Sequence, residues 1–394
     1  MNVSGVHGNI LKYYLYKPLS QLEIMRVIAV LFLLSNDLSF KQILLLQALH
    51  AIIITIMEVP TGAFADIFGR KKTLISGSLL VTTGCFFYCI GSQFAIFAVG
   101  ELLWATGAAI ISGADDALLY DSLKQNNAED RYKKIIGNIW SLIFLFEGVG
   151  SILGGLLATI SFRIPIYATF ISFLTAVIIA CTFQEPEVYT RESKATFLFN
   201  QMKESISYTI KKKILSLLIV YASVNYILYA IGFYFYQPYM KAVGITLSLF
   251  GVIYLIYNCM SALGSKYASD IEEKIGTVNA ILLTSIFRYI PFILMAIFMS
   301  PYSVILLFCV GFSVGLAGPI FSFYINKHTP SEKRATIISL AAMARTVGFS
   351  VLSPIFGWLA DLYSFYFSIF LSGVILLIIT TVLQMYMRVR KEDL

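Results

Sequence analysis

Apolar runs long enough to cross a bilayer follow one another along almost the whole chain, and this pattern restricts the possible folds more than any other feature. Short polar or charged breaks divide the 394 residues into twelve such runs. A membrane-spanning helix needs about 20 apolar residues, so twelve of them leave only termini and joining loops. The predicted spans are 13–36, 40–64, 73–95, 97–122, 134–160, 163–183, 214–237, 245–268, 276–299, 301–325, 335–360 and 363–387.

The composition agrees with a bilayer environment. Hydrophobic residues make up 58% of the chain and charged residues 13%, whereas about 25% of the residues in a soluble domain are charged. The runs are apolar on every face, which excludes a transmembrane β-barrel, because barrel strands alternate apolar and polar residues. The predicted fold class is therefore an all-α membrane protein without a folded soluble domain.

Basic residues mark one side of the membrane. When the loops are assigned alternately to two sides, 23 of the 29 Lys and Arg residues fall on one side and 3 on the other. Since positive charge collects in cytoplasmic loops, both termini are expected in the cytoplasm. The net charge of +7 then reflects topology, and no nucleic-acid partner is expected.

The longest polar stretch separates two halves of six spans. We expect an N-terminal bundle at 1–184, a cytoplasmic linker at 185–213 and a C-terminal bundle at 214–394. An offset of 203 residues aligns Gly154 with Gly357, and other short matches follow the same shift. Together they predict a duplicated six-helix unit, a common plan for secondary transporters.

The loop after the second span carries the most specific motif. From Gly62 to Leu74 it reads GAFADIFGRKKTL. It resembles the loop signature of the major facilitator superfamily, G-x-L-A-D-x-x-G-R-[RK]-x-x-L, with Phe64 in place of Leu and Ile67 where a basic residue is frequent. With twelve spans and related halves, the resemblance covers the whole chain. It implies the major facilitator fold, two pseudo-symmetric six-helix bundles, and transport by alternating access.

The same resemblance implies that this loop latches one conformation of the transporter. In such a latch, glycines allow a tight turn, an aspartate can sit at the N-terminus of another helix, and Arg70 can pair with Asp121. The alternative is that the basic residues only anchor the loop on the cytoplasmic side. The expected latch residues are Gly62, Asp66, Gly69, Arg70, Lys71 and Asp121.

Span five contains a glycine-rich stretch from Gly148 to Gly155. It resembles the signature of proton-linked drug antiporters, which ends G-P-x-x-G-G, with Ser151 at the proline position. The alternative is simple helix packing, because Gly150 and Gly154 form a small-residue face.

Ionisable residues inside the spans are functional candidates, because each costs at least about 2.5–3.5 kcal/mol at a helix centre. The expected substrate- or proton-coupling residues are Glu23, Arg26, Asp116, Glu147, Arg288 and Arg345. Glu147 is the candidate proton carrier in the middle of span five. Glu23 and Arg26 share a helix face by spacing, so they could instead form a local pair. Glu101 is expected at the membrane interface.

The charges and tyrosines give the functional prediction. We expect proton-coupled export of small amphipathic or drug-like molecules, with a tyrosine-rich span seven suited to such substrates. The alternative is uptake of an anionic nutrient or metabolite bound by Arg288 and Arg345. A polytopic membrane enzyme fits least, since the three His residues form no catalytic or zinc-binding pattern. We expect no cofactor or metal, and a monomer in the cell membrane.

Overall fold

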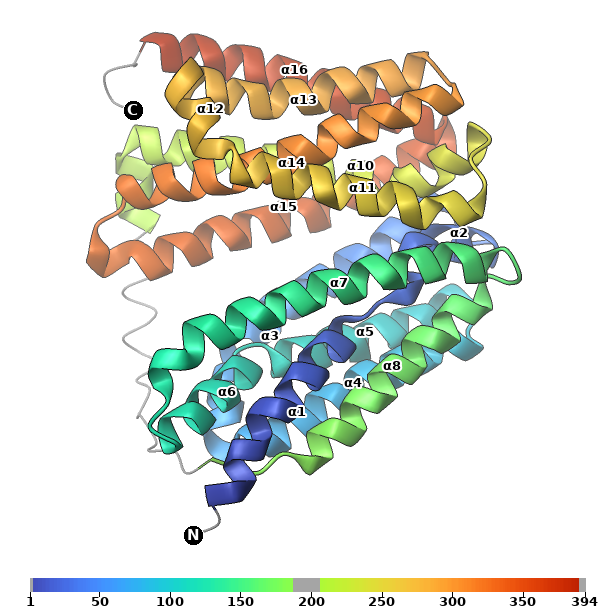
Figure 1. Ribbon diagram of the computed structural model, residues 1–394. Helices are drawn as coiled ribbons and strands as arrows, with labels where there is room; N and C mark the ends of the chain where they lie inside the picture. Colours follow the sequence, from blue (N-terminus) through green and yellow to red (C-terminus); the bar gives the residue numbers. More distant parts are fainter. Residues whose placement is uncertain (1–2, 187–205, 390–394) are drawn as a thin grey trace. The chain divides into compact units, whose positions relative to one another are not determined.

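The computed structural model describes residues 3–186 and 206–389, and helices account for most of them (Figure 1). No β-strand occurs within these two ranges. Eleven helical stretches among the described residues are long and apolar enough to cross a membrane. The all-α class and the multi-span architecture predicted from hydropathy are therefore confirmed.

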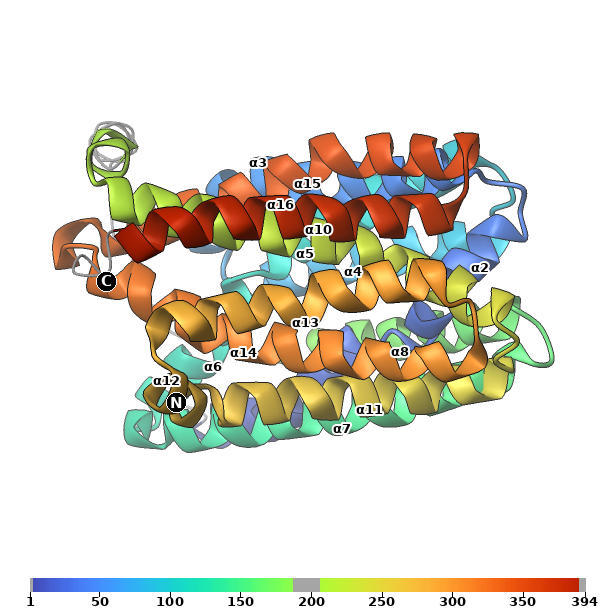
Figure 2. The same ribbon diagram turned by 90° about the horizontal axis from the view of Figure 1, so that it is seen from above.

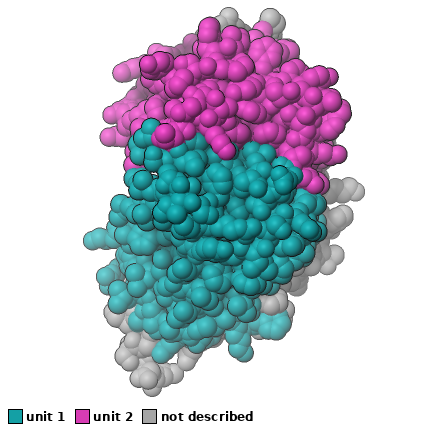
Figure 3. All heavy atoms as spheres, turned by 90° about the vertical axis from the view of Figure 1, so that its right-hand side faces the viewer, with its two compact units in different colours: residues 1–38, 46–193, 247–252 teal, residues 39–45, 194–246, 253–394 magenta. Residues whose placement is uncertain are grey.

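The chain divides into two compact units, coloured separately in Figure 3. Unit 1 comprises Met1–Leu38, Leu46–Ser193 and Leu247–Val252, and unit 2 comprises Ser39–Leu45, Lys194–Thr246 and Ile253–Leu394. This division resembles the predicted halves except that each unit takes one short segment from the other half of the sequence. Most of the predicted linker, 185–213, lies outside the described residues.

The described residues 3–186 contain eight α-helices. They are α1 (Val3–Gln21), α2 (Ala29–Leu34), α3 (Phe40–Phe68), α4 (Arg70–Ile90), α5 (Phe94–Ile111), α6 (Ala114–Gln125), α7 (Tyr132–Ala158) and α8 (Arg163–Thr182), with 3₁₀ turns η1 (Ile24–Val27) and η2 (Glu129–Arg131). The second half contains α10 (Lys213–Ala242), α11 (Leu247–Lys266), α12 (Ala268–Ile275), α13 (Thr277–Ile297), α14 (Ile305–Lys327), α15 (Arg334–Leu362) and α16 (Phe365–Val389), with 3₁₀ turns η3 (Pro301–Val304) and η4 (Ser331–Lys333).

The two units pack their helices in the same pattern. In unit 1, α4 packs against α5 and α8, and α1 packs against α7 and α8. In unit 2, α13 packs against α14 and α16 (Figure 2), and α10 packs against α15 and α16. When the spans of each half are numbered from one to six, the same span numbers are in contact in both units. A duplicated six-helix unit predicts this agreement.

One turn is repeated almost unchanged in both units. Gly69 precedes α4 with φ 86° and ψ 157°, and Gly276 precedes α13 with φ 81° and ψ 157°. Only glycine adopts this backbone region readily. Glycine at these two positions therefore fixes the entry of the corresponding helix in each repeat.

The first predicted span, 13–36, is not one continuous helix. Leu22 and Glu23 are non-helical. The helix α1 ends just before them, and η1 and α2 follow them. Neighbouring side chains satisfy part of the freed backbone: Thr169 Oγ1 accepts from Met25 N at 3.0 Å, and Ser172 Oγ donates to Leu19 O at 2.9 Å. Broken helices inside membrane proteins persist where neighbouring helices supply such partners.

The fourth predicted span, 97–122, is also divided. Ser112 and Gly113 separate α5 from α6, and Gly113 has φ 82°. Because α6 begins as a separate helix, the helical spacing of the predicted span does not continue to the acidic residues that follow. The consequence for Asp115 and Asp116 is described below.

Candidate functional site

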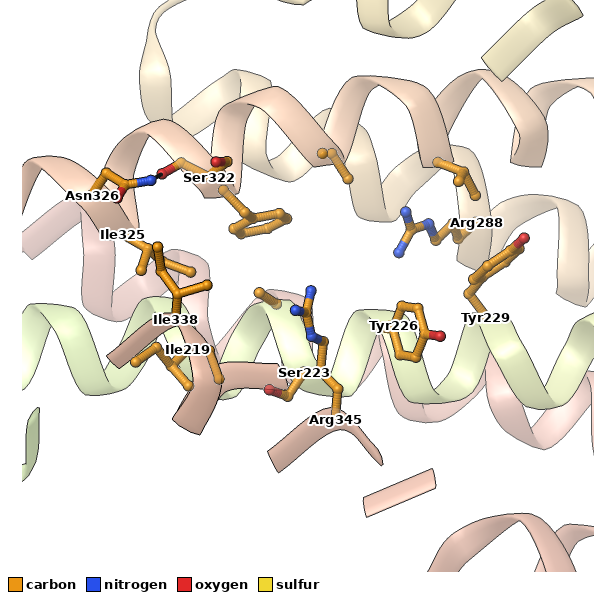
Figure 4. Close-up of a pocket in the computed structure, with 16 residues that line it drawn as sticks. Ile219, Ser223, Tyr226, Tyr229, Arg288, Ser322, Ile325, Asn326, Ile338 and Arg345 are labelled. Atoms are coloured by element: carbon orange, nitrogen blue, oxygen red, sulfur yellow. Dashed lines mark hydrogen bonds between the residues drawn. The ribbon is translucent and has the colours of Figure 1, made fainter. Parts of the chain in front are cut away.

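A cavity of about 240 Å³ lies within unit 2, between α10, α13, α14 and α15 (Figure 4). Most of its wall is apolar and comes from residues such as Ile219, Ala317 and Phe321. The polar side chains that line it are Ser223, Tyr226, Tyr229, Arg288, Ser322, Asn326 and Arg345. A mostly apolar pocket with a few converging polar groups is the usual form of a small-molecule site.

Arg288 of α13 is only 4% exposed. Its Nε donates to Ser313 Oγ at 2.8 Å, and its Nη1 donates to the carbonyl oxygen of Asn225 at 3.1 Å. These neutral partners hold the guanidinium in place, but none of the described residues supplies a carboxylate to it. A buried charge without a counter-ion is costly, so this position favours a negatively charged ligand.

Arg345 of α15 reaches the same cavity from another helix, and Figure 4 shows both guanidinium groups directed into it. Each arginine lies over a tyrosine of α10. The Arg345 Cζ is 5.6 Å from the Tyr226 ring centroid, and the Arg288 Cζ is 5.4 Å from the Tyr229 ring centroid. Both distances lie within the range of cation–π attraction. The predicted pair Arg288 and Arg345 thus belongs to one cavity.

Ser223 contributes a further polar group to the cavity wall. The residue is buried, and its Oγ has no hydrogen-bond partner among the residues that the structure describes. A buried hydroxyl without a partner costs roughly 1–3 kcal/mol.

In unit 1, the glycines of span five pack against the break in the first span. A Cβ on Gly154 would overlap the carbonyl oxygen of Ile24, and one on Gly150 would lie 2.5 Å from Leu22 Cδ1. Gly155 makes a comparable close approach, to the carbonyl oxygen of Leu247. The glycine-rich stretch therefore has a packing role, as the alternative interpretation of the sequence proposed.

Glu147 lies on the same helix, α7, and forms an ion pair with Arg26. The distance from Arg26 Nη1 to Glu147 Oε1 is 3.9 Å, and the side chains are 55% and 28% exposed respectively. Glu23 lies in the break itself, so the helical spacing that suggested a local Glu23–Arg26 pair does not apply. The structure brings Arg26 and Glu147 together instead.

The adjacent aspartates of α6 differ from the prediction. Asp115 is buried and forms an ion pair with Lys17 of α1, whereas Asp116 is exposed and accepts a hydrogen bond from the hydroxyl of Tyr13 at 2.9 Å. The sequence analysis singled out Asp116 and not Asp115 as the candidate for coupling. A lysine within the apolar run 13–36 was the signal that could have revealed this pair.

Glu101 was expected at the membrane interface, but it is buried. His50 Nδ1 lies 2.6 Å from Glu101 Oε2, and the Tyr88 hydroxyl also bonds to this carboxyl group. Proximity to the end of a span does not show which way a side chain points, so the sequence did not reveal the burial of Glu101. His50 here makes the helix–helix hydrogen bond typical of a single membrane histidine.

The structure describes the side chains of some of the predicted latch residues. Arg70 Nε lies 3.5 Å from Asp121 Oδ2, the pair expected from the sequence. The carboxylate of Glu185 accepts from the backbone N–H groups of Arg70 at 2.5 Å and Lys71 at 2.8 Å. It thus caps the N-terminus of α4 beside Gly69, a contact that the sequence did not reveal.

Gly62 and Asp66 belong to α3, but the side chains of residues 58–67 lie outside what the structure describes. Their contribution to a latch remains a prediction from the sequence.

Comparison with known families identifies the architecture. The sequence model of the Major Facilitator Superfamily matches residues 21–353. The chain belongs to this superfamily. A crystal structure of the nucleoside transporter NupG superposes on this superfamily member with a TM-score of 0.79 at 12% identity, covering 97% of this chain and 98% of that one. At this identity the likeness shows the fold alone.

Two curated relatives are similar to this superfamily member over most of their length. An uncharacterised MFS-type transporter of Bacillus subtilis, YxaM, is 24% identical over 83% of each chain. A multi-drug resistance efflux pump PmrA homolog of Lactococcus lactis is 23% identical over 75% of this chain and 72% of its own. Membership makes this chain a multi-pass membrane protein and a secondary transporter of small molecules rather than an enzyme.

Proposed function

We propose that this transporter exports small amphipathic molecules in exchange for protons, across the cell membrane and with both termini in the cytoplasm. The observation that carries the proposal is the Arg26–Glu147 ion pair beside the broken first span. Both side chains are partly exposed, so neighbouring residues do not fully enclose the carboxylate. Its separation of 3.9 Å is longer than a charge-assisted hydrogen bond, which makes the pair easy to open.

Protonation would change the charges at this site in a defined way. A neutral Glu147 no longer attracts the guanidinium of Arg26, so the electrostatic link between α7 and the segment that carries Arg26 is weakened. Because Leu22 and Glu23 are outside any helix, the segment that carries Arg26 can shift without breaking a continuous ladder of backbone hydrogen bonds. This gives a physical route from proton binding to conformational change.

The unit 2 cavity supports an amphipathic substrate, since it combines apolar walls with a few charged and polar groups. Export is supported by the name of the Lactococcus lactis relative, a multi-drug resistance efflux pump homolog.

Uptake of an anionic nutrient or metabolite is the second candidate, favoured by Arg288 and Arg345 in one cavity. Direction of flux in intact cells separates the two. Accumulation of a substrate inside energised cells that make the protein would support uptake, and lowered accumulation would support export.

The decisive experiment uses the purified protein in proteoliposomes with an imposed pH gradient. Two probes of opposite charge, ethidium and 1-naphthalenesulfonate, are followed by fluorescence in the parent, Glu147→Gln and the control Asp130→Asn, which alters an exposed acid in η2. We expect Glu147→Gln to lose gradient-driven transport while it keeps gradient-independent exchange, and Asp130→Asn to behave like the parent. Transport that persists unchanged after the pH gradient is collapsed would contradict proton coupling.

A further inference from the structure

The polar lining of the unit 2 cavity has only one sign of charge. Two guanidinium groups enter it, and among the described residues that line it there is neither Asp nor Glu. Arg288 is held by the neutral oxygens of Ser313 and Asn225. The guanidinium groups of Arg288 and Arg345 therefore share one cavity, and no described lining residue supplies a negative charge to balance them.

We propose that this cavity binds an anionic group of the substrate, a carboxylate, sulfonate or phosphate, between Arg345 and Arg288. The inference rests on the proposed transport function, and it names the substrate class for that function. Arginine is suited to this task because its planar fork of N–H groups matches the oxygens of such anions.

The two arginines have different roles. Three hydrogen bonds to Ser313 and Asn225 already fix the guanidinium of Arg288, so it supplies charge in a preset position. Arg345 is partly exposed and donates no hydrogen bond to any residue that the structure describes; its contact is the stacking on Tyr226. Arg345 is therefore the direct ligand-binding group, and Arg288 reinforces the positive potential.

The rest of the cavity fits the remainder of a small amphipathic anion. Ser223 lines the cavity, and rotation of its side chain would turn the unpartnered hydroxyl toward a polar atom of the ligand, while the rings of Tyr226 and Tyr229 offer a surface for an apolar or aromatic body. A volume of about 240 Å³ is below the roughly 300–1,000 Å³ of pockets for drug-sized ligands. The ligand is accordingly a small organic anion rather than a bulky one.

Equilibrium binding to the full-length protein in detergent tests this inference without any gradient. Three probes share one ring system and differ in charge: 1-naphthalenesulfonate, 1-naphthalenesulfonamide and 1-naphthylmethylammonium. Thermal shift and tryptophan fluorescence report binding at millimolar probe concentrations. Variants are Arg345→Gln, Arg345→Lys and the control Lys213→Gln, which removes an exposed positive charge from α10 outside the cavity.

We expect the sulfonate to bind and to outcompete the neutral and cationic probes. Arg345→Gln should weaken sulfonate binding roughly tenfold or more. Arg345→Lys should lose less affinity for the sulfonate, and Lys213→Gln should bind it as tightly as the parent does. Equal binding of all three probes, sulfonate binding that survives Arg345→Gln, or no sulfonate binding would each overturn the inference. A protein that binds the sulfonate but shows no proton-driven flux would refute the proposed function and leave the anion site standing.

Discussion

Lys17 of α1 and Asp115 of α6 form an ion pair whose two side chains are at most 10% exposed. Removing one member leaves an uncompensated buried charge, which typically costs about 3–5 kcal/mol. We therefore expect Asp115→Asn or Lys17→Met to lower the unfolding temperature of the detergent-solubilised protein strongly. The double variant should recover part of the loss. Lys12→Met, on the same helix but outside the pair, should change the unfolding temperature little.

The two repeated glycine turns provide a matched comparison. Gly69→Ala should be strained by its φ of 86° and should also push against Glu185, whose carboxyl carbon lies 2.9 Å from the new Cβ. Gly276→Ala has comparable backbone strain, about 1–3 kcal/mol, but no atom within 4 Å of its Cβ. Thermal unfolding should therefore show a larger loss for Gly69→Ala.

A double-variant cycle locates the source of that difference. Adding Glu185→Ala to Gly69→Ala removes the clashing carboxylate. The loss of stability in the double variant should therefore be smaller than the sum of the losses in the two single variants. Strictly additive losses would mean that Glu185 does not press on this turn.

The glycines of α7 differ in what surrounds them. Gly154→Ala should displace the break in the first span, because its Cβ would overlap the backbone of Ile24. Gly150→Ala meets only the flexible end of Leu22 and should be milder. Gly137→Ala, with no atom within 4 Å, should be neutral or stabilising by up to about 1 kcal/mol. Transport rate and thermal unfolding of the three variants check this order, and equal effects would refute it.

Ser223→Ala separates folding from ligand binding. The buried Oγ has no partner in the described residues, so its removal should leave the stability of the empty protein unchanged or raise it by about 1 kcal/mol. The same change should weaken binding of 1-naphthalenesulfonate. Thermal unfolding with and without the probe measures both effects, and a large loss in the empty protein would show that Ser223 has a structural role.

Hydropathy and charge bias predicted most of the fold because a bilayer imposes long apolar helices, and these leave a direct trace in the sequence. The break at Leu22 and Glu23 left no such trace, since neither residue is Gly or Pro. The residues that contact the break, Thr169 and Gly154, are distant in sequence and reach it only when the helices pack.

The candidate site could be predicted only in part. Arg288 and Arg345 were recognisable as charges in apolar runs, but their shared cavity depends on the packing of α13 and α15 around α10. The choice between Asp115 and Asp116 depended on the direction of α6 after the turn at Gly113. Spacing along the chain does not specify that direction, so the buried aspartate became evident only in three dimensions.

The paired turns at Gly69 and Gly276 also bear on the evolutionary history of the protein. Their backbone angles nearly coincide, yet Glu185 occupies the space beside Gly69, whereas none of the described residues occupies the equivalent space beside Gly276. After an ancestral duplication, selection would have retained the shape in both copies, because few substitutions for glycine are tolerated there. The electrostatic partner was under no such restriction, so the two copies could acquire different tasks without altering the scaffold they share.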